Sequence, residues 1–263
     1  MLALLAQLAS IPADPGANAA RAASTIERFP EADLAVFPEL FLSAYDLGAL
    51  AATSRPAGCE ELRTVAAAAA GASTAVVIGF AERLDGTAVA NAAACIAADG
   101  ELVAVYRKTH LFGAEEAAFE RGRDLSVVEL AGRAVGPLIC FDIEFPEPAR
   151  QLALAGAELL VSPSANMEPF GDDHELASRA RALENRLPHL YVNATGTLGG
   201  NHFVGRSRAV GPGGEVLAEA PGDGEALLVV SVPAPGAADE RVDYLRYIRG
   251  ELPVVLRRRT ARP

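Results

Sequence analysis

The chain has 263 residues, of which 51% are hydrophobic and 22% charged, a composition typical of a globular protein rather than a disordered or fibrous one. Its net charge of -11 at pH 7 repels phosphates and anionic lipid headgroups, so we expect neither nucleic acid nor a membrane as a partner. Three cysteines are too few for a disulfide framework in a chain this long. This count predicts free thiols and a reducing, cytoplasmic compartment.

Two apolar runs are predicted to belong to the folded core. The N-terminal run MLALLAQLAS has no basic leader, which favours a first strand over a signal peptide. The uncharged run 64–81 is mostly alanine and is interrupted by Gly71, Ser73 and Thr74. It is therefore interpreted as the end of a helix followed by a strand, and not as a membrane span.

The first part of the chain alternates between strand and helix patterns. The predicted elements are a strand at 2–8, a helix at 15–29, a strand at 33–37, a helix at 59–70 that ends at Gly71, and a strand at 75–82. A hairpin follows over 87–107, because two extended runs flank the turn signal Ala98-Asp99-Gly100. This order is typical of a layered α/β protein.

The second part resumes the alternation and ends with closing strands. The predicted elements are a strand at 133–140, a helix at 146–155, a strand at 158–162, a helix at 172–186, a strand at 189–195 and antiparallel strands within 203–230. Residues from about 236 onward are rich in arginine and are interpreted as a surface tail or as a segment that packs on another subunit. We therefore expect a single domain over 1–263, with a mixed sheet system covered by helices.

One residue stands out by its rarity. Of 23 basic residues 22 are arginine, and the single lysine is Lys108, at the end of a predicted strand. A compact, rotatable ammonium is not reproduced by arginine, which favours a chemical role. The alternative is chance in a chain that avoids lysine.

Two further chemical groups follow predicted strands. Glu39 comes directly after an apolar strand and after Pro38, which places a carboxylate at the carboxyl edge of the sheet, where α/β proteins keep their sites. Cys140 ends another predicted strand shortly before a helix, and a helix amino end together with an ammonium lowers a thiol pKa. A base, an oxyanion stabiliser and a nucleophile together suit acyl transfer. Cys140 and Glu39 also have ordinary structural alternatives, a core cysteine and a loop carboxylate.

Three sequence blocks resemble a known family. FPE at 37–39, YRKTHLF at 106–112 and LICFDIEFPE at 138–147 are similar, in order and separation, to the signature blocks of the nitrilase superfamily of carbon-nitrogen hydrolases. PSAN at 163–166, RARALEN at 179–185, YVN at 191–193 and GRS at 205–207 resemble further segments of that family. The resemblance spans nearly the whole chain.

The resemblance implies a four-layer α-β-β-α sandwich with Cys140 as nucleophile, Glu39 as general base and Lys108 as oxyanion stabiliser, assisted by the backbone N–H of Phe141. A second glutamate is implied seven or eight residues after the lysine, so Glu115 and Glu116 are both candidates. Glu115 is preferred because Phe119 and Gly122 then align with the family's aromatic residue and glycine, although Arg121 replaces the usual proline. The implied mechanism needs neither a metal nor an organic cofactor.

The residues after the cysteine suggest a branch of the family. Phe141-Asp142 is similar to amidases and carbamoylases, whereas nitrilases usually have Trp-Glu there. Carbamoylases often have a carboxylate-binding arginine where this chain has Glu144, so we expect Glu144 to face the pocket and to favour a cationic or hydrogen-bond-donating amide. The alternative is a glutamate at a helix amino end. The resemblance also implies that Asn166 lines the pocket and that Asp142 orients the loop that carries Cys140.

The expected function is hydrolysis of a small carboxamide to an acid and ammonia through a cysteine thioester. The alternatives are an N-carbamoyl amidohydrolase, a nitrilase, an acyltransferase, and a non-catalytic α/β binding protein. The resemblance implies a homodimer or a larger homo-oligomer. His110 is interpreted as a structural hydrogen-bonding residue. His174, His189 and His202 show no spacing of metal ligands, and Cys59 and Cys95 are interpreted as small hydrophobic residues.

Overall fold

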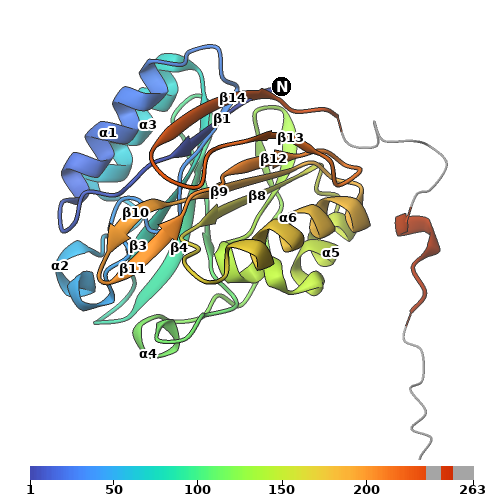
Figure 1. The fold of residues 1–263 in the computed structure, drawn as a ribbon. Coiled ribbons are helices and arrows are strands. Elements are labelled where there is room, and N and C mark those ends of the chain that lie inside the picture. The colour runs from blue at the N-terminus through green and yellow to red at the C-terminus, as the bar shows by residue number, and fades with distance from the viewer. Residues whose placement is uncertain (235–243, 251–263) are drawn as a thin grey trace, which may run out of the picture.

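The computed structural model describes residues 1–234 and 244–250, and its helices and strands form four layers (Figure 1). One six-stranded sheet has the order β14-β1-β2-β3-β4-β5, and a second has the order β13-β12-β9-β8-β7-β6. In both sheets three central strands are parallel and the outer strands are antiparallel. The predicted α-β-β-α sandwich is thereby confirmed.

The first sheet and its helices come from the first part of the chain and from its last strand. Their bounds are β1 Leu2–Gln7, α1 Pro15–Glu27, β2 Leu34–Val36, α3 Glu60–Ala72, β3 Ala75–Arg83, β4 Val89–Ile96, β5 Leu102–Arg107 and β14 Ala226–Ser231. The predicted hairpin turn is confirmed, because Gly100 lies between β4 and β5 with a φ of 88°. The helix predicted to end at Gly71 continues to Ala72, and the left-handed residue that ends it is Ser73, with a φ of 56°.

The second sheet and its helices follow. Their bounds are β6 Val128–Leu130, β7 Arg133–Pro137, α5 Pro146–Leu154, β8 Leu159–Ser164, α6 Gly171–Asn185, β9 His189–Asn193, β12 Arg208–Val210 and β13 Val216–Glu219. A separate hairpin joins β10 (Thr195–Leu198) to β11 (Asn201–Val204). The strand predicted to reach Cys140 ends at Pro137, because proline has no N–H for the ladder and the chain then turns into the short helix η2 (Cys140–Glu144).

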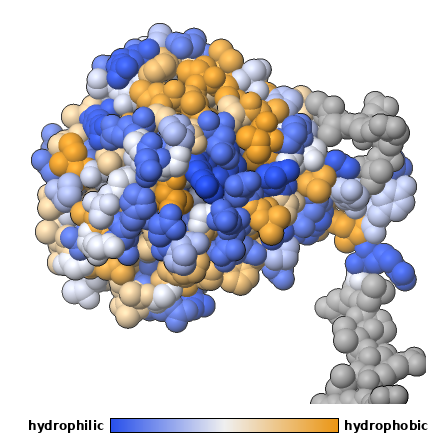
Figure 2. Space-filling model, viewed as in Figure 1, coloured by the Kyte–Doolittle hydropathy of each residue, from blue (hydrophilic) through white to orange (hydrophobic). Residues whose placement is uncertain are grey.

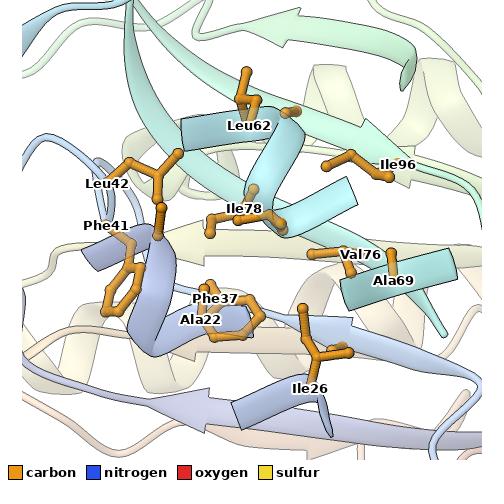
Figure 3. Close-up of a cluster of buried hydrophobic side chains, with 14 of the residues drawn as sticks. Ala22, Ile26, Phe37, Phe41, Leu42, Leu62, Ala69, Val76, Ile78 and Ile96 are labelled. Carbon is orange, nitrogen blue, oxygen red and sulfur yellow. The ribbon is translucent and has the colours of Figure 1, made fainter. Parts of the chain in front are cut away.

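Strand alternation explains how the layers are held together. In β1, Ala3 and Leu5 face the second sheet, and Leu4 and Ala6 face α1 and α3. Figure 3 shows the outer cluster, in which Ile26 of α1 and Leu62 of α3 lie over side chains of the sheet. A corresponding cluster lies between the second sheet and α5 and α6. Small alanine side chains on both helix pairs let the layers approach closely.

The surface of the described part is mixed in character. Figure 2 shows hydrophilic side chains interspersed with smaller hydrophobic patches on one face. Leu154, Leu176 and Leu183 are exposed on α5 and α6. Within the described residues no helix is both long and apolar enough to cross a membrane. The homodimer that the family resemblance implies stays a prediction.

Most of the predicted C-terminal tail lies outside the described residues, namely 235–243 and 251–263. The described piece contains η3 (Tyr244–Tyr247), which lies beside α6 of its own chain. The guanidinium carbon of Arg186 lies 4.4 Å from the centre of the Tyr244 ring. Leu245 packs against the cluster beneath α5 and α6. This piece therefore contacts its own chain.

Candidate active site

Three buried charged side chains form the centre of the site. Lys108 Nζ lies 2.6 Å from Glu39 Oε1 and 2.9 Å from Glu115 Oε2. Asn91 donates a hydrogen bond of 2.7 Å to Glu39 Oε1, and the Tyr45 hydroxyl donates one of 2.8 Å to Glu115 Oε1. All three charged side chains are at most 1% exposed. One ammonium is thus held between two carboxylates in a space closed to water.

The ends of strands bring these groups together. Glu39 follows β2, and Lys108 follows β5, which runs in the same direction as β2. Glu115 begins the four-residue helix α4 (Glu115–Ala118) and accepts a hydrogen bond of 2.9 Å from the Phe112 N–H. Gly79 of β3 lies against the turn that carries Glu39, where a Cβ would overlap the backbone. This close approach requires glycine.

Cys140 stands at a strained turn between β7 and α5. Its φ of 47° lies in the left-handed region, which costs an L-residue roughly 1–2 kcal/mol. Asp142 stabilises this turn, because its Oδ2 accepts hydrogen bonds from the Ile139 N–H at 2.9 Å and the Tyr106 hydroxyl at 2.8 Å. Its Oδ1 accepts one of 2.9 Å from the His110 N–H. A single buried carboxylate therefore joins the cysteine turn to the strand end that carries Lys108.

The electrostatics of the site favour a protonated thiol beside a carboxylate of high proton affinity. Burial, and after it the Glu39 charge, raise the pKa of Cys140 well above its ordinary value, although Lys108 and the Ala165 N–H act in the opposite direction. Burial also raises the pKa of Glu39, against the lowering effect of Lys108. Burial opposes the charge of Lys108, but Glu39 and the neighbouring acidic groups raise the pKa of Lys108 well above its usual value. Lys108 therefore remains an ammonium.

A pocket opens above Cys140 and Lys108. Its free volume is about 20 Å³. The lining residues are Tyr45, Lys108, Phe112, Cys140, Phe141, Glu144, Ala165, Asn166, Met167, Phe170 and His174. The Phe112 ring stands edge-on to Phe141 and to Phe170, with centroid distances of 5.3 and 5.5 Å. The walls are thus largely aromatic, and polar groups gather at the base and at one side.

Glu144 lies on the polar side of this pocket. Its Oε1 is 3.1 Å from His174 Nε2, and His174 Nδ1 is 3.0 Å from the Tyr191 hydroxyl. Burial lowers the pKa of His174 and raises that of Tyr191 well above its ordinary value, so the ring is neutral and the hydroxyl keeps its proton. Tyr191 then donates to His174, and His174 donates to Glu144. This chain fixes a carboxylate at the pocket wall.

The other predicted residues are also placed by the structure. Phe141 is the second residue of η2, where backbone N–H groups of a helix's first turn point outward, and its ring lines the pocket. Asn166 lines the pocket too, but its Nδ2 donates to the Phe170 carbonyl at 3.0 Å and its Oδ1 accepts from the Met167 N–H at 2.9 Å. Its amide therefore shapes the 166–170 loop. Glu116 is exposed and pairs with Arg121, away from the cluster around Lys108.

Sequence reasoning missed three polar residues of the site. Asn91 was an available signal, because it interrupts a run of alanine and valine in a predicted strand. Tyr45 follows Glu39 by six residues in an irregular segment. Because this segment has no helix or strand pattern, the sequence does not predict where the Tyr45 side chain points. His174 has no spacing of metal ligands in the sequence, and only the fold brings α6 to η2.

A comparison with protein families decides the classification. The family model described as carbon-nitrogen hydrolase matches residues 2–239. The chain belongs to the carbon-nitrogen hydrolase family. Membership in this family confirms the resemblance seen in the sequence and makes the protein a hydrolase.

Individual members of the carbon-nitrogen hydrolase family are similar over most of their length. An (R)-stereoselective amidase of a Pseudomonas species is 39% identical over 243 residues, which cover 91% of this chain and 88% of the amidase. A protein of Pseudomonas protegens named hydrolase in pqqF 5'region is 40% identical over 222 residues, covering 83% and 78% of the two chains. The crystal structure of an amidase from Nesterenkonia sp. superposes with a TM-score of 0.85 at 31% identity, covering 95% of this chain and 93% of that one.

The hydrogen bonds of Asp142 lead to a prediction for this carbon-nitrogen hydrolase. Replacing Asp142 by asparagine removes acceptor capacity from a buried group, and a hydrogen bond to a charged group contributes about 1.5–3 kcal/mol. We expect Asp142→Asn to lower kcat by about tenfold to a hundredfold and to lower the melting temperature. Kinetics and thermal unfolding measure the two effects.

The matched control is Asp99→Asn in the exposed turn between β4 and β5, which should leave both quantities near those of the unmodified protein. An Asp142→Asn variant with unchanged kcat would contradict the positioning role of this carboxylate.

Proposed function

We propose that the protein is an amidase that converts a short carboxamide to the acid and ammonia through a thioester on Cys140. The observation that carries this proposal is the buried Glu39–Lys108–Glu115 cluster at the base of the pocket that contains Cys140. Solved structures of the Nesterenkonia amidase add support. They include mutants of that amidase in complex with acrylamide and with butyramide, and a mutant that shows covalent addition of the acetamide moiety of fluoroacetamide at its active-site cysteine.

Acylation begins with a proton transfer inside the cluster. Glu39 takes the proton of the Cys140 thiol as the sulfur attacks the amide carbon. Lys108 and the Phe141 N–H stabilise the negative charge that develops on the carbonyl oxygen. The protonated Glu39 then gives its proton to the leaving nitrogen, the C–N bond breaks, and ammonia departs. The acyl group stays on the sulfur as a thioester.

Glu115 supports this chemistry through Lys108. Its carboxylate is a second partner of Nζ beside Glu39, and Tyr45 and the Phe112 N–H hold the carboxylate in turn. A buried ammonium with one partner can swing, whereas one with two partners points in a fixed direction. We therefore assign Glu115 the task of orienting Lys108 toward the oxyanion.

The pocket favours substrates without a negative charge. Among the described lining residues the buried ammonium of Lys108 is already paired, and Glu144 adds a carboxylate at the wall. An anionic acyl group would meet repulsion from Glu144, and a cation or a hydrogen-bond donor would be attracted. These features favour a carboxamide over an N-carbamoyl amino acid.

Nitrile hydrolysis is the second candidate. Relatives named nitrilase come from Schizosaccharomyces pombe and Pyrococcus abyssi, each 32% identical to this chain. A nitrile carbon is open to the same attack by Cys140. Amide and nitrile hydrolysis are therefore distinguished by assaying the protein with both kinds of substrate.

Ammonia release tests the proposed function directly. Purified protein is incubated with five compounds in separate assays. They are butyramide, an aminoacyl amide, an uncharged analogue of that amide, an N-carbamoyl amino acid and butyronitrile. We expect release from the amides, little from the anionic carbamoyl compound, and none in a Cys140→Ala variant. Cys95→Ala, which removes a buried thiol from the core between the sheets, is the matched control and should retain activity. Ammonia release that persists in Cys140→Ala would exclude the cysteine mechanism.

The charge of Glu144 yields a second prediction. Glu144→Arg replaces a carboxylate by a cation at the pocket wall, so the ranking of kcat/KM should move from cationic toward anionic amides. Glu144→Gln, which removes the charge and keeps the size, should abolish the preference for cationic over neutral substrates. Glu147→Arg is the control, because Glu147 is an exposed residue of α5. An unchanged ranking in Glu144→Arg would remove Glu144 from the substrate site.

A further inference from the structure

Helix α6 holds the short helix η2, which carries Cys140 and Glu144, through two side chains. Arg181 Nε donates a hydrogen bond of 2.9 Å to the Ile143 carbonyl, and Arg181 Nη2 donates one of 3.4 Å to the Glu144 carbonyl. His174 lies about two helical turns earlier on the same face of α6, and its Nε2 is 3.1 Å from Glu144 Oε1. Arg181 thus fixes the backbone at the end of η2, and the contact with His174 sets the direction of the Glu144 side chain.

The Glu144 carboxylate needs this contact to stay at the pocket wall. The side chain is 31% exposed, so water is available as a competing partner. Among the described residues, His174 is the one side chain that forms a hydrogen bond with the carboxylate, and Oε2 forms none with any of them. A glutamate held in one rotamer loses side-chain entropy. Without His174, the carboxylate would therefore be free to turn into solvent.

His174 holds this carboxylate without neutralising it. Burial lowers the pKa of His174 against the effect of Glu144, and the cations Lys108 and Arg208 lower it further. The ring therefore stays neutral and has a single proton. The Tyr191 hydroxyl donates to Nδ1, which places that proton on Nε2, toward Glu144. A neutral donor leaves the negative charge of the carboxylate unpaired, whereas a lysine or an arginine in the same place would cancel it.

The surroundings of Glu144 increase its effect on a bound cation. Exposed ion pairs contribute little, because water screens them and because both side chains lose freedom when they pair. Here the rings of Phe112, Phe141 and Phe170 line the same pocket and reduce the screening. The contact with His174 removes the freedom of the carboxylate before a substrate arrives. A carboxylate held in this way discriminates between charged and uncharged acyl chains.

We propose that His174 is a positioning residue that sets the charge preference of the pocket, because it holds Glu144 as an unpaired anion for an ammonium group of the substrate. This inference rests on the proposed amidase function. The leaving group of a carboxamide is ammonia, so the ammonium belongs to the acyl chain. The preferred substrate is thus a short amide with a protonated amine on its acyl chain, and His174 and Glu144 lie in the wall of the pocket that contains Cys140.

A pair of matched substrates tests the role of His174. β-Alaninamide and butyramide have the same length, and the ammonium of the first replaces the terminal methyl group of the second. The ratio of their kcat/KM values, measured by ammonia release, does not depend on the fraction of protein that is folded. His174→Asn is too short to reach Glu144, whereas His174→Gln keeps an N–H donor near the position of Nε2. His202→Asn, the same change at an exposed position of β11, is the matched control.

We expect the unmodified protein to favour β-alaninamide and His174→Asn to lower the ratio about tenfold, as for the loss of one hydrogen bond to a charged group, through a higher KM for β-alaninamide. His174→Gln and His202→Asn should keep the ratio of the unmodified protein. A ratio unchanged in His174→Asn, a ratio lowered equally in His174→Gln, or no preference in the unmodified protein would overturn the role of His174. Failure of the unmodified protein to release ammonia from either amide would instead overturn the proposed function, and this role with it.

Discussion

The contact of 2.6 Å between Lys108 Nζ and Glu39 Oε1 is the interaction on which the site depends. Removing one partner of a buried ion pair costs about 3–5 kcal/mol, because the other charge is left in a medium that solvates it poorly. The fold therefore has to supply both residues together. Glu115 adds a second carboxylate, and its charge helps to raise the pKa of Glu39, so the cluster as a whole favours taking up a proton.

The rest of the architecture holds this cluster in place. Strand ends from both sheets meet at one edge, and the Glu39 N–H donates to the Ser164 carbonyl of β8 across the sheet interface at 3.3 Å. Gly79 allows the Glu39 turn to lie directly on β3, and Asp142 fixes the left-handed turn at Cys140. Small side chains and one buried carboxylate thus convert a layered core into a site with fixed geometry. The same packing leaves a narrow pocket above Cys140 and Lys108.

The sequence predicted those parts that depend on local pattern. Alternating apolar residues predicted the strands, the amphipathic runs predicted α1, α3, α5 and α6, and the position of Glu39, Lys108 and Cys140 after strands placed them at one edge. The sequence did not predict α4 or β6, because elements of four and three residues are too short to show a periodic spacing of hydrophobic residues. The contacts of Tyr45 and His174 could not be predicted from the sequence for another reason. They depend on how loops fold over the sheet edge, which only the tertiary structure defines.

The ionisation of Cys140 is the most direct test of the account, which requires a protonated thiol at rest and Glu39 as the group that accepts its proton. Thiolate absorbance in the ultraviolet is measured against pH for the unmodified protein, for Glu39→Gln, and for Cys140→Ala, which subtracts Cys59 and Cys95. Because the Glu39 charge raises the pKa of Cys140 while Lys108 lowers it, the account predicts no Cys140 thiolate at neutral pH in the unmodified protein and a lower thiol pKa in Glu39→Gln. A stable thiolate at neutral pH, insensitive to Glu39→Gln, would contradict it and would show that Lys108 alone activates the sulfur.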